Sequence, residues 1–234
     1  MLAVLTRGRE QDAELARRLE EAGLGVLYLP IISYEKLEEG YSALQDAILE
    51  PWDWVVLTSP TAARYFIGAW YLAGAPEVRV AAVGERTREV LEGQGLEVAF
   101  VPSRAEGAAL AAELPGGGRV LWPTSARAGR ELEKTLRERG FAVRRLDVYT
   151  LRPRRPTEEE RARAVGADLV LFGSPSAVSA WVEAGLSRLP VAAVGRTTGQ
   201  RAEELGFSPV RWPERPGTEG WVDAALALAR ELAG

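Results

Sequence analysis

The chain has 234 residues, 47% of them hydrophobic, and a formal net charge of −4. It contains neither cysteine nor histidine, which excludes disulfides, thiolate chemistry, imidazole metal sites and every catalytic triad that needs a histidine. The negative charge disfavours nucleic-acid binding, and no apolar run approaches the roughly 20 residues of a membrane span.

The chain begins directly with the strand-like segment 2–5 and shows no charged leader with a cleavage site. We therefore expect a soluble, cytoplasmic protein that contacts neither nucleic acid nor membrane, and we expect a monomer. Asparagine is absent, methionine occurs once, and arginine far outnumbers lysine. This composition favours a thermophilic source, although a compositional bias of the genome produces the same pattern.

Strands and helices alternate along the chain. Apolar runs predict strands at 2–6, 25–32, 54–58, 79–83, 98–101, 119–122 and 143–149, and near 168–172, 190–194 and 209–212. Amphipathic segments predict helices over 10–22, from about 60, 86 and 105, over 127–139, between the later strands, and over 218–232. This alternation indicates an α/β fold in which helices cover both faces of parallel sheets.

Two blocks of sequence, one long and one short, each occur twice. In the long block, residues 53–62 return as 168–177, and 80–84 return as 191–195. A shorter block returns as well, because Glu14, Val26 and Leu29 match Glu131, Val143 and Leu146. The order along the chain is short, long, short, long. A short block followed by a long one gives the five strands of a flavodoxin-like doubly wound sheet.

This block order fits two domain arrangements. In the nested arrangement, residues 1–34 with 154–234 form one flavodoxin-like domain and 37–149 form the other. The crossings near 33–38 and 149–156 would then make a two-stranded hinge. In the tandem arrangement the domains are consecutive, and the Gly116–Gly118 run is the linker. We predict the nested arrangement, because the segment 151–156 is rich in proline, as a crossing would be.

Small and hydroxylic residues follow the predicted strands, where ligands of open parallel sheets bind. Each such segment leads into a helix, whose free N–H groups suit carboxylates or phosphates. The candidates are Ser59, Thr87, Ser174, Ser176, Thr197 and Thr198. Ordinary capping by serine and threonine explains any one of them equally well. Two copies of the same loop favour a shared cleft.

Three further side chains have both a binding and a packing interpretation. Arg7 and Arg130 can pair with an acidic ligand or with nearby glutamates on the helix surfaces. Tyr149 lies at an expected crossing, where its phenol can point into the cleft or pack as a strand aromatic. The familiar phosphate motifs are missing, since Gly93-Gln94-Gly95 follows a helix and no Walker lysine exists.

With these segments assembled, the chain resembles the uroporphyrinogen-III synthase family over nearly its full length. The resemblance is carried by Val4-Leu5-Thr6-Arg7, Leu29-Pro30 with Ile31-Ile32, Thr58-Ser59-Pro60, Ala82-Val83-Gly84 with Thr87, Asp147-Val148-Tyr149, Phe172-Gly173-Ser174-Pro175-Ser176, and Ala193-Val194-Gly195 with Thr197-Thr198. Each motif is short, but their order and spacing together are specific. The family's fold, two such domains joined by a two-stranded ladder, favours the nested arrangement.

The resemblance implies a reaction. Members of the family close the linear, acidic tetrapyrrole hydroxymethylbilane to uroporphyrinogen III, losing water and inverting the last pyrrole ring, without metal or cofactor. The position matching Tyr149 is the favoured proton donor to the leaving hydroxyl. Ser59, Thr87, Ser174, Ser176, Thr197 and Thr198 match positions that contact substrate carboxylates. The alternative is a noncatalytic two-lobed protein that binds an acidic small molecule.

Overall fold

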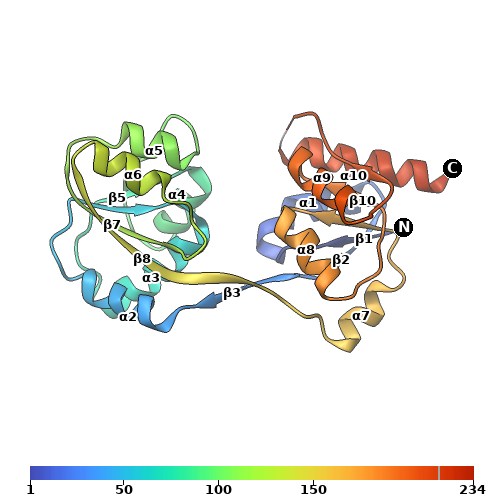
Figure 1. The fold of residues 1–234 in the computed structure, drawn as a ribbon, viewed down its shortest axis with the longest axis horizontal. Coiled ribbons are helices and arrows are strands. Elements are labelled where there is room, and N and C mark those ends of the chain that lie inside the picture. The colour runs from blue at the N-terminus through green and yellow to red at the C-terminus, as the bar shows by residue number, and fades with distance from the viewer. Residues whose placement is uncertain (216) are drawn as a thin grey trace. The chain divides into compact units, whose positions relative to one another are not determined.

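The computed structural model describes residues 1–215 and 217–234 and divides them into two compact units. The terminal unit joins the two ends of the chain, Met1–Ser33 and Arg152–Gly234, and the central unit is Tyr34–Leu151. The chain passes from one unit to the other twice. Figure 1 shows the first and last segments of the chain within one unit.

The terminal unit is built on a parallel sheet of five strands. Its strands are β1 (Leu2–Leu5), β2 (Gly25–Tyr28), β9 (Leu169–Phe172), β10 (Val191–Ala193) and β11 (Val210–Arg211). Their spatial order is β2-β1-β9-β10-β11, and all four pairings are parallel. This is the flavodoxin order of a doubly wound sheet, with β1 paired on both sides.

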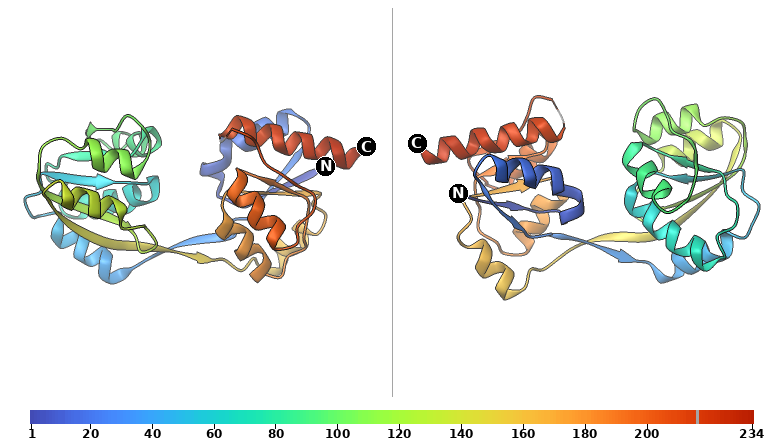
Figure 2. Two further views of the ribbon diagram at one scale, coloured as in Figure 1. Left: turned by 45° about the horizontal axis from the view of Figure 1, so that its top comes forward. Right: turned by 180° about the vertical axis from the view of Figure 1, so that it is seen from behind.

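Helices cover both faces of that sheet (Figure 2). Helices α1 (Arg9–Glu21) and α10 (Thr218–Ala233) bury Leu15 and Trp221 against one face. Helices α7 (Glu158–Ala164), α8 (Pro175–Glu183) and α9 (Arg196–Glu204) contribute Ala164, Trp181 and Ala202 to the core on the other face. The alternation of side chains along each strand supplies both cores.

The central unit repeats this plan with a permuted chain. Its strands are β3 (Ile32–Lys36), β4 (Trp54–Leu57), β5 (Val80–Ala82), β6 (Val98–Phe100), β7 (Gly118–Ser125) and β8 (Phe141–Pro153). The spatial order is β3-β8-β7-β4-β5-β6, and the pairings from β8 to β6 are parallel. Strands β7 and β8 therefore take the places that β1 and β2 take in the terminal unit.

Five helices cover the central sheet. Helices α2 (Glu38–Ala47), α3 (Pro60–Leu72) and α4 (Glu85–Glu92) pack on one face, where Leu44, Phe66 and Leu91 are buried together. Helices α5 (Gly107–Glu113) and α6 (Glu131–Glu138) pack on the other face through Leu110 and Leu136. We call these the α3 face and the α6 face of the central sheet.

One irregularity interrupts the long pairing of β7 with β8. Thr124 pairs with Asp147, but the next residue of β7, Ser125, pairs with Tyr149. Strand β8 therefore advances by two residues while β7 advances by one. Val148 is the extra residue of a β-bulge.

The fold class predicted from the sequence is confirmed: the protein is α/β, with two doubly wound parallel sheets in a nested topology. The strand predicted at 25–32 is instead two strands, because Pro30 cannot donate a ladder hydrogen bond. Helix α6 begins at Glu131, four residues later than predicted, after a loop that contains Gly129. Among the described residues, no helix is long and apolar enough to span a bilayer.

Candidate functional site

Tyr149 and Ser59 meet at the carboxyl edge of the central sheet. Ser59 is the N-cap of α3, and its hydroxyl accepts a hydrogen bond of 3.0 Å from the amide of Ala62. The Ser59 Oγ also lies 3.1 Å from the phenolic oxygen of Tyr149. Two residues that lie 90 positions apart are thus joined by a hydrogen bond in which either hydroxyl can be the donor.

Other tyrosines surround the phenol. The ring of Tyr65 stacks on that of Tyr149 with 5.2 Å between centroids, and Tyr34 meets it edge-on at 6.0 Å. Tyr149 is only 5% exposed. This burial raises the pKa of the Tyr149 phenol above its ordinary value, while the hydrogen bond from Ser59 acts to lower it. Tyr149 is therefore a protonated phenol at neutral pH.

Thr87 and Arg130 belong to the same edge of the central sheet but differ in access. Thr87 is in the first turn of α4, after β5, and only 2% of it is exposed. Arg130 precedes α6 as its N-cap and is exposed. Arg130 is therefore open to solvent at this edge, whereas the side chain of Thr87 is enclosed by the protein.

Arg145 on β8 organises the loop after β7, a role that the sequence did not indicate. Its guanidinium donates to Asp147 at 2.8 Å, to the carbonyl oxygen of Ser125 at 3.1 Å and to that of Gly129 at 3.4 Å. It lies over the ring of Trp122, 5.1 Å from the centroid. Arg145 thus holds the loop that leads to Arg130. Arg145 and Asp147 lie two residues apart on one strand, and this spacing was the sequence signal from which their ion pair could have been predicted.

The terminal unit has a matching edge at the ends of β9 and β10. Ser174 caps α8, accepts from the amide of Ala177 at 3.2 Å, and lies 3.0 Å from the hydroxyl of Ser176. Thr197 and Thr198 are in the first turn of α9, where Thr197 is exposed and Thr198 is 3% exposed. Neutral hydroxyls and helix N-termini here suit an anionic ligand.

Arg7 follows β1 at this edge and is engaged within its own unit. Its guanidinium pairs with the buried carboxylate of Asp12 in α1 and lies over the ring of Trp221 at 4.9 Å. A Cβ at residue 173 would lie 2.8 Å from Cδ of Arg7, so Gly173 leaves room for this side chain. The partner of Arg7 is therefore an aspartate, which the sequence analysis did not identify.

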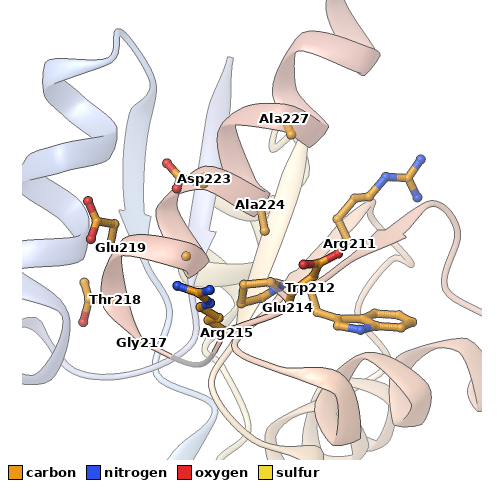
Figure 3. A pocket seen from close by; sticks show the side chains of 12 residues that line it. Arg211, Trp212, Glu214, Arg215, Gly217, Thr218, Glu219, Asp223, Ala224 and Ala227 are labelled. Carbon is orange, nitrogen blue, oxygen red and sulfur yellow. The ribbon is translucent and has the colours of Figure 1, made fainter.

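A cavity of about 840 Å³ lies in the terminal unit between the chain after β11 and the start of α10 (Figure 3). Arg215, Glu219 and Asp223 are among the charged side chains that line it. Both signs of charge are present, so the cavity does not favour a polyanion. None of the residues predicted from the sequence lines this cavity. Among the described residues, no group of three or more acidic side chains is placed to hold a metal ion.

Comparison with known proteins agrees with this architecture. The family model described as "Uroporphyrinogen-III synthase HemD" matches residues 13–223. The chain is 37% identical to the chloroplastic uroporphyrinogen-III synthase of Oryza sativa subsp. japonica, over 97% of this chain and 80% of that one. It is 26% identical to the uroporphyrinogen-III synthase of Chlorobaculum parvum, over 90% and 92% of the two chains.

Solved structures share the fold. The uroporphyrinogen-III synthetase of Helicobacter pylori aligns with a TM-score of 0.66 at 20% identity, over 97% of this chain and 98% of that one. A mutant uroporphyrinogen III synthase of Thermus thermophilus aligns with a TM-score of 0.59 at 22% identity, over 100% and 99%. The family model and the rice relative cover most of the sequence, and the chain therefore belongs to the uroporphyrinogen-III synthase family.

Proposed function

We propose that this chain carries out the reaction of its family with Tyr149 as the proton donor. The reaction closes hydroxymethylbilane to uroporphyrinogen III, with loss of one water and inversion of the terminal pyrrole ring. The observation that carries the proposal is the buried pair of hydroxyls, Tyr149 and Ser59, 3.1 Å apart at the carboxyl edge of the central sheet. Ligands of doubly wound sheets bind at this edge.

The phenol can supply the proton that the leaving hydroxyl needs. Hydroxide leaves poorly, so a proton must reach the substrate's hydroxyl as its bond to carbon breaks. Burial raises the pKa of Tyr149 and keeps the proton on the phenol until the substrate arrives. Ser59 can then donate a hydrogen bond to the phenolate oxygen, which lowers the cost of the proton transfer. The departing group leaves as water, an electron-rich pyrrole carbon bonds to the methylene carbon that the hydroxyl left, and the proton released as the ring closes returns to the phenolate.

The helix N-termini provide the binding side of the proposal. We assign substrate carboxylates to the turns at Ser59 in the central unit and at Ser174, Ser176 and Thr197 in the terminal unit. A charged group at a helix N-terminus gains about 0.3–1 kcal/mol, so several turns are needed to outweigh the negative net charge of the protein. Arg130 and the exposed part of Arg7 add cations. Thr87 and Thr198 are buried, so we assign no substrate carboxylate to them.

Turnover with isomer analysis tests the function. Purified protein should consume hydroxymethylbilane and yield the inverted type III isomer, whereas unaided closure gives the uninverted isomer. Tyr149→Phe should fold normally and yield the type III isomer much more slowly. Binding of the bilane without acceleration of its closure would instead establish a noncatalytic binding protein, and a fast Tyr149→Phe variant would place the proton donor elsewhere.

We further propose that the protein is a cytoplasmic monomer from a thermophile and does not bind nucleic acid. The net charge of −4 supports the absence of nucleic-acid binding, and the absence of asparagine and the single methionine support a thermophilic source. Sedimentation should give the mass of one chain, 25.4 kDa. Thermal unfolding should begin well above the range of mesophilic domains, about 45–65 °C. A dimer or an ordinary melting temperature would contradict the corresponding assignment.

A further inference from the structure

The bulge in β8 decides which face of the central sheet receives the Tyr149 phenol. Side chains of a regular strand alternate between faces, so residues 145 and 149 would lie on the same side. They do not. Arg145 lies over Trp122, which belongs to the core on the α6 face. Tyr149 belongs to the core on the α3 face, together with its neighbour Val148.

The extra residue at Val148 accounts for this reversal. It places two consecutive side chains, Val148 and Tyr149, on the α3 face, where Ser59 and Tyr65 lie. Without it, Tyr149 would point toward α6 and could not reach the Ser59 hydroxyl. Bulges next to functional sites commonly re-aim one side chain in this way.

Helix α2 packs directly on the backbone of the bulge. A Cβ at residue 40 would overlap the carbonyl oxygen of Asp147, and it would lie 2.8 Å from the carbonyl carbon and 3.5 Å from Cα of Val148. These are backbone atoms, which cannot turn away as a flexible side chain can. One turn earlier, the amide of Leu37 donates to the carbonyl oxygen of Val148 at 3.0 Å.

We propose that Gly40 is a positioning residue for Tyr149: it lets α2 approach β8, and this contact fixes the bulge that points the phenol at Ser59. Gly40 touches no reacting atom in this proposal. The catalytic part of the inference rests on the proposed role of Tyr149 as proton donor, whereas the orientation of the phenol can be measured without any turnover.

The test is Gly40→Ala, examined by carbon-13 NMR of protein labelled at the tyrosine Cζ. Six tyrosines give six signals, and the signal that Tyr149→Phe removes is that of Tyr149. In Gly40→Ala this signal should shift and its titration should change. The kcat should fall about 10²-fold with little change in KM, as a small misplacement of a catalytic group predicts. Gly107→Ala is the control, because its Cβ would lie at an ordinary 3.6 Å from Leu132.

A double-mutant cycle separates positioning from general damage. In a Tyr149→Phe background, Gly40→Ala should cost no further kcat, because the group that it positions is already gone. An unshifted Tyr149 signal in folded Gly40→Ala would overturn the inference. A double variant whose kcat falls by the product of the two single losses would overturn it as well. If wild-type protein shows no turnover, the function fails while the NMR result still decides the inference.

A second variant covers the case in which Gly40→Ala does not fold. Leu37→Pro replaces the N–H that bonds the bulge with a ring Cδ that presses on the carbonyl oxygen of Val148, and it should shift the same Tyr149 signal. In the wild-type protein, the α-protons of Gly40 should show nuclear Overhauser contacts to the α-proton of Val148. Their absence would overturn the inference whatever the variants do.

Discussion

The two units have the same backbone conformation at their matching helix N-caps but differ in the side chains that meet there. The caps Ser59 and Ser174 have φ and ψ of −158° and 154°, and −166° and 156°. The caps Gly84 and Gly195 both have −177° and 176°. In the central unit, however, the Ser59 hydroxyl pairs with the distant Tyr149, whereas in the terminal unit the Ser174 hydroxyl pairs with the neighbouring Ser176.

The difference arises in the second strand of each short block. The repeat that aligns Leu29 with Leu146 puts Ile32 at the position of Tyr149. Strand β2 ends at Tyr28, before Pro30, while β8 continues to Pro153 and carries the bulge. The duplicated part thus keeps the helix N-termini that suit anions, and the part that differs adds a buried phenol to one copy.

The largest expected effect is on turnover. Tyr149→Phe should lower kcat by about 10²–10⁴-fold, because a positioned general acid contributes that much. Ser174→Ala should lower it less, since the backbone amides of α8 still face the ligand. Steady-state kinetics on hydroxymethylbilane give both values. Equal losses in the two variants would show that the units do not divide binding and chemistry between them.

The next effect is on stability. Arg145→Met should lower the free energy of unfolding by about 1–3 kcal/mol, because the carbonyl of the buried residue Ser125 loses its donor. Only 11% of the Arg145 side chain is exposed. Urea denaturation measures the change. The control is Arg130→Met at the exposed end of the same loop, which should stay within about 0.5 kcal/mol of the wild type.

A smaller effect separates the two serine caps. Ser59→Ala and Ser174→Ala should each cost about 1 kcal/mol of stability, because each loses one capping bond. Only Ser59→Ala should also raise the pKa of Tyr149 further, since the Ser59 hydroxyl acts to lower it. Ultraviolet titration of the phenol detects the difference. The same tyrosine titration curve in both variants would contradict the hydrogen bond.

The smallest effect appears in alkali. Burial raises the pKa of Tyr149 in the folded protein above the unfolded value of about 10, so the folded state holds this proton more tightly. This contribution to stability is complete below pH about 10 and is lost as pH rises through the folded pKa. Urea titrations should therefore show a steeper alkaline loss for the wild type than for Tyr149→Phe. Parallel curves would mean that the phenol ionises equally well in both states.

Sequence periodicity identified most elements because each one builds a core. The helices α2 and α7 were not predicted, because α7 buries only Ala164 of its seven residues and α2 follows directly on the crossing strand β3. The duplicated loops placed Ser59 and Ser174 on helix caps, since capping is a local property.

The remaining features of the site depend on contacts between distant segments. No local pattern could show that Arg7 pairs with Asp12 rather than with a glutamate, or that Arg145 bonds the loop before α6. The bulge was hidden for the same reason, because the two apolar residues Val148 and Tyr149 also fit a regular buried strand. Tertiary pairing decides which face such residues take.

The nested topology also sets the order in which the protein can fold during its synthesis. Strand β1 lies between β2 and β9, yet β9 follows the whole central unit along the chain. The central unit is one continuous segment, so the ribosome releases all of it while one side of β1 still lacks its neighbour. An unpaired apolar strand is an aggregation hazard. A chain stalled before Leu169 would therefore carry a complete central unit attached to an aggregation-prone N-terminal strand.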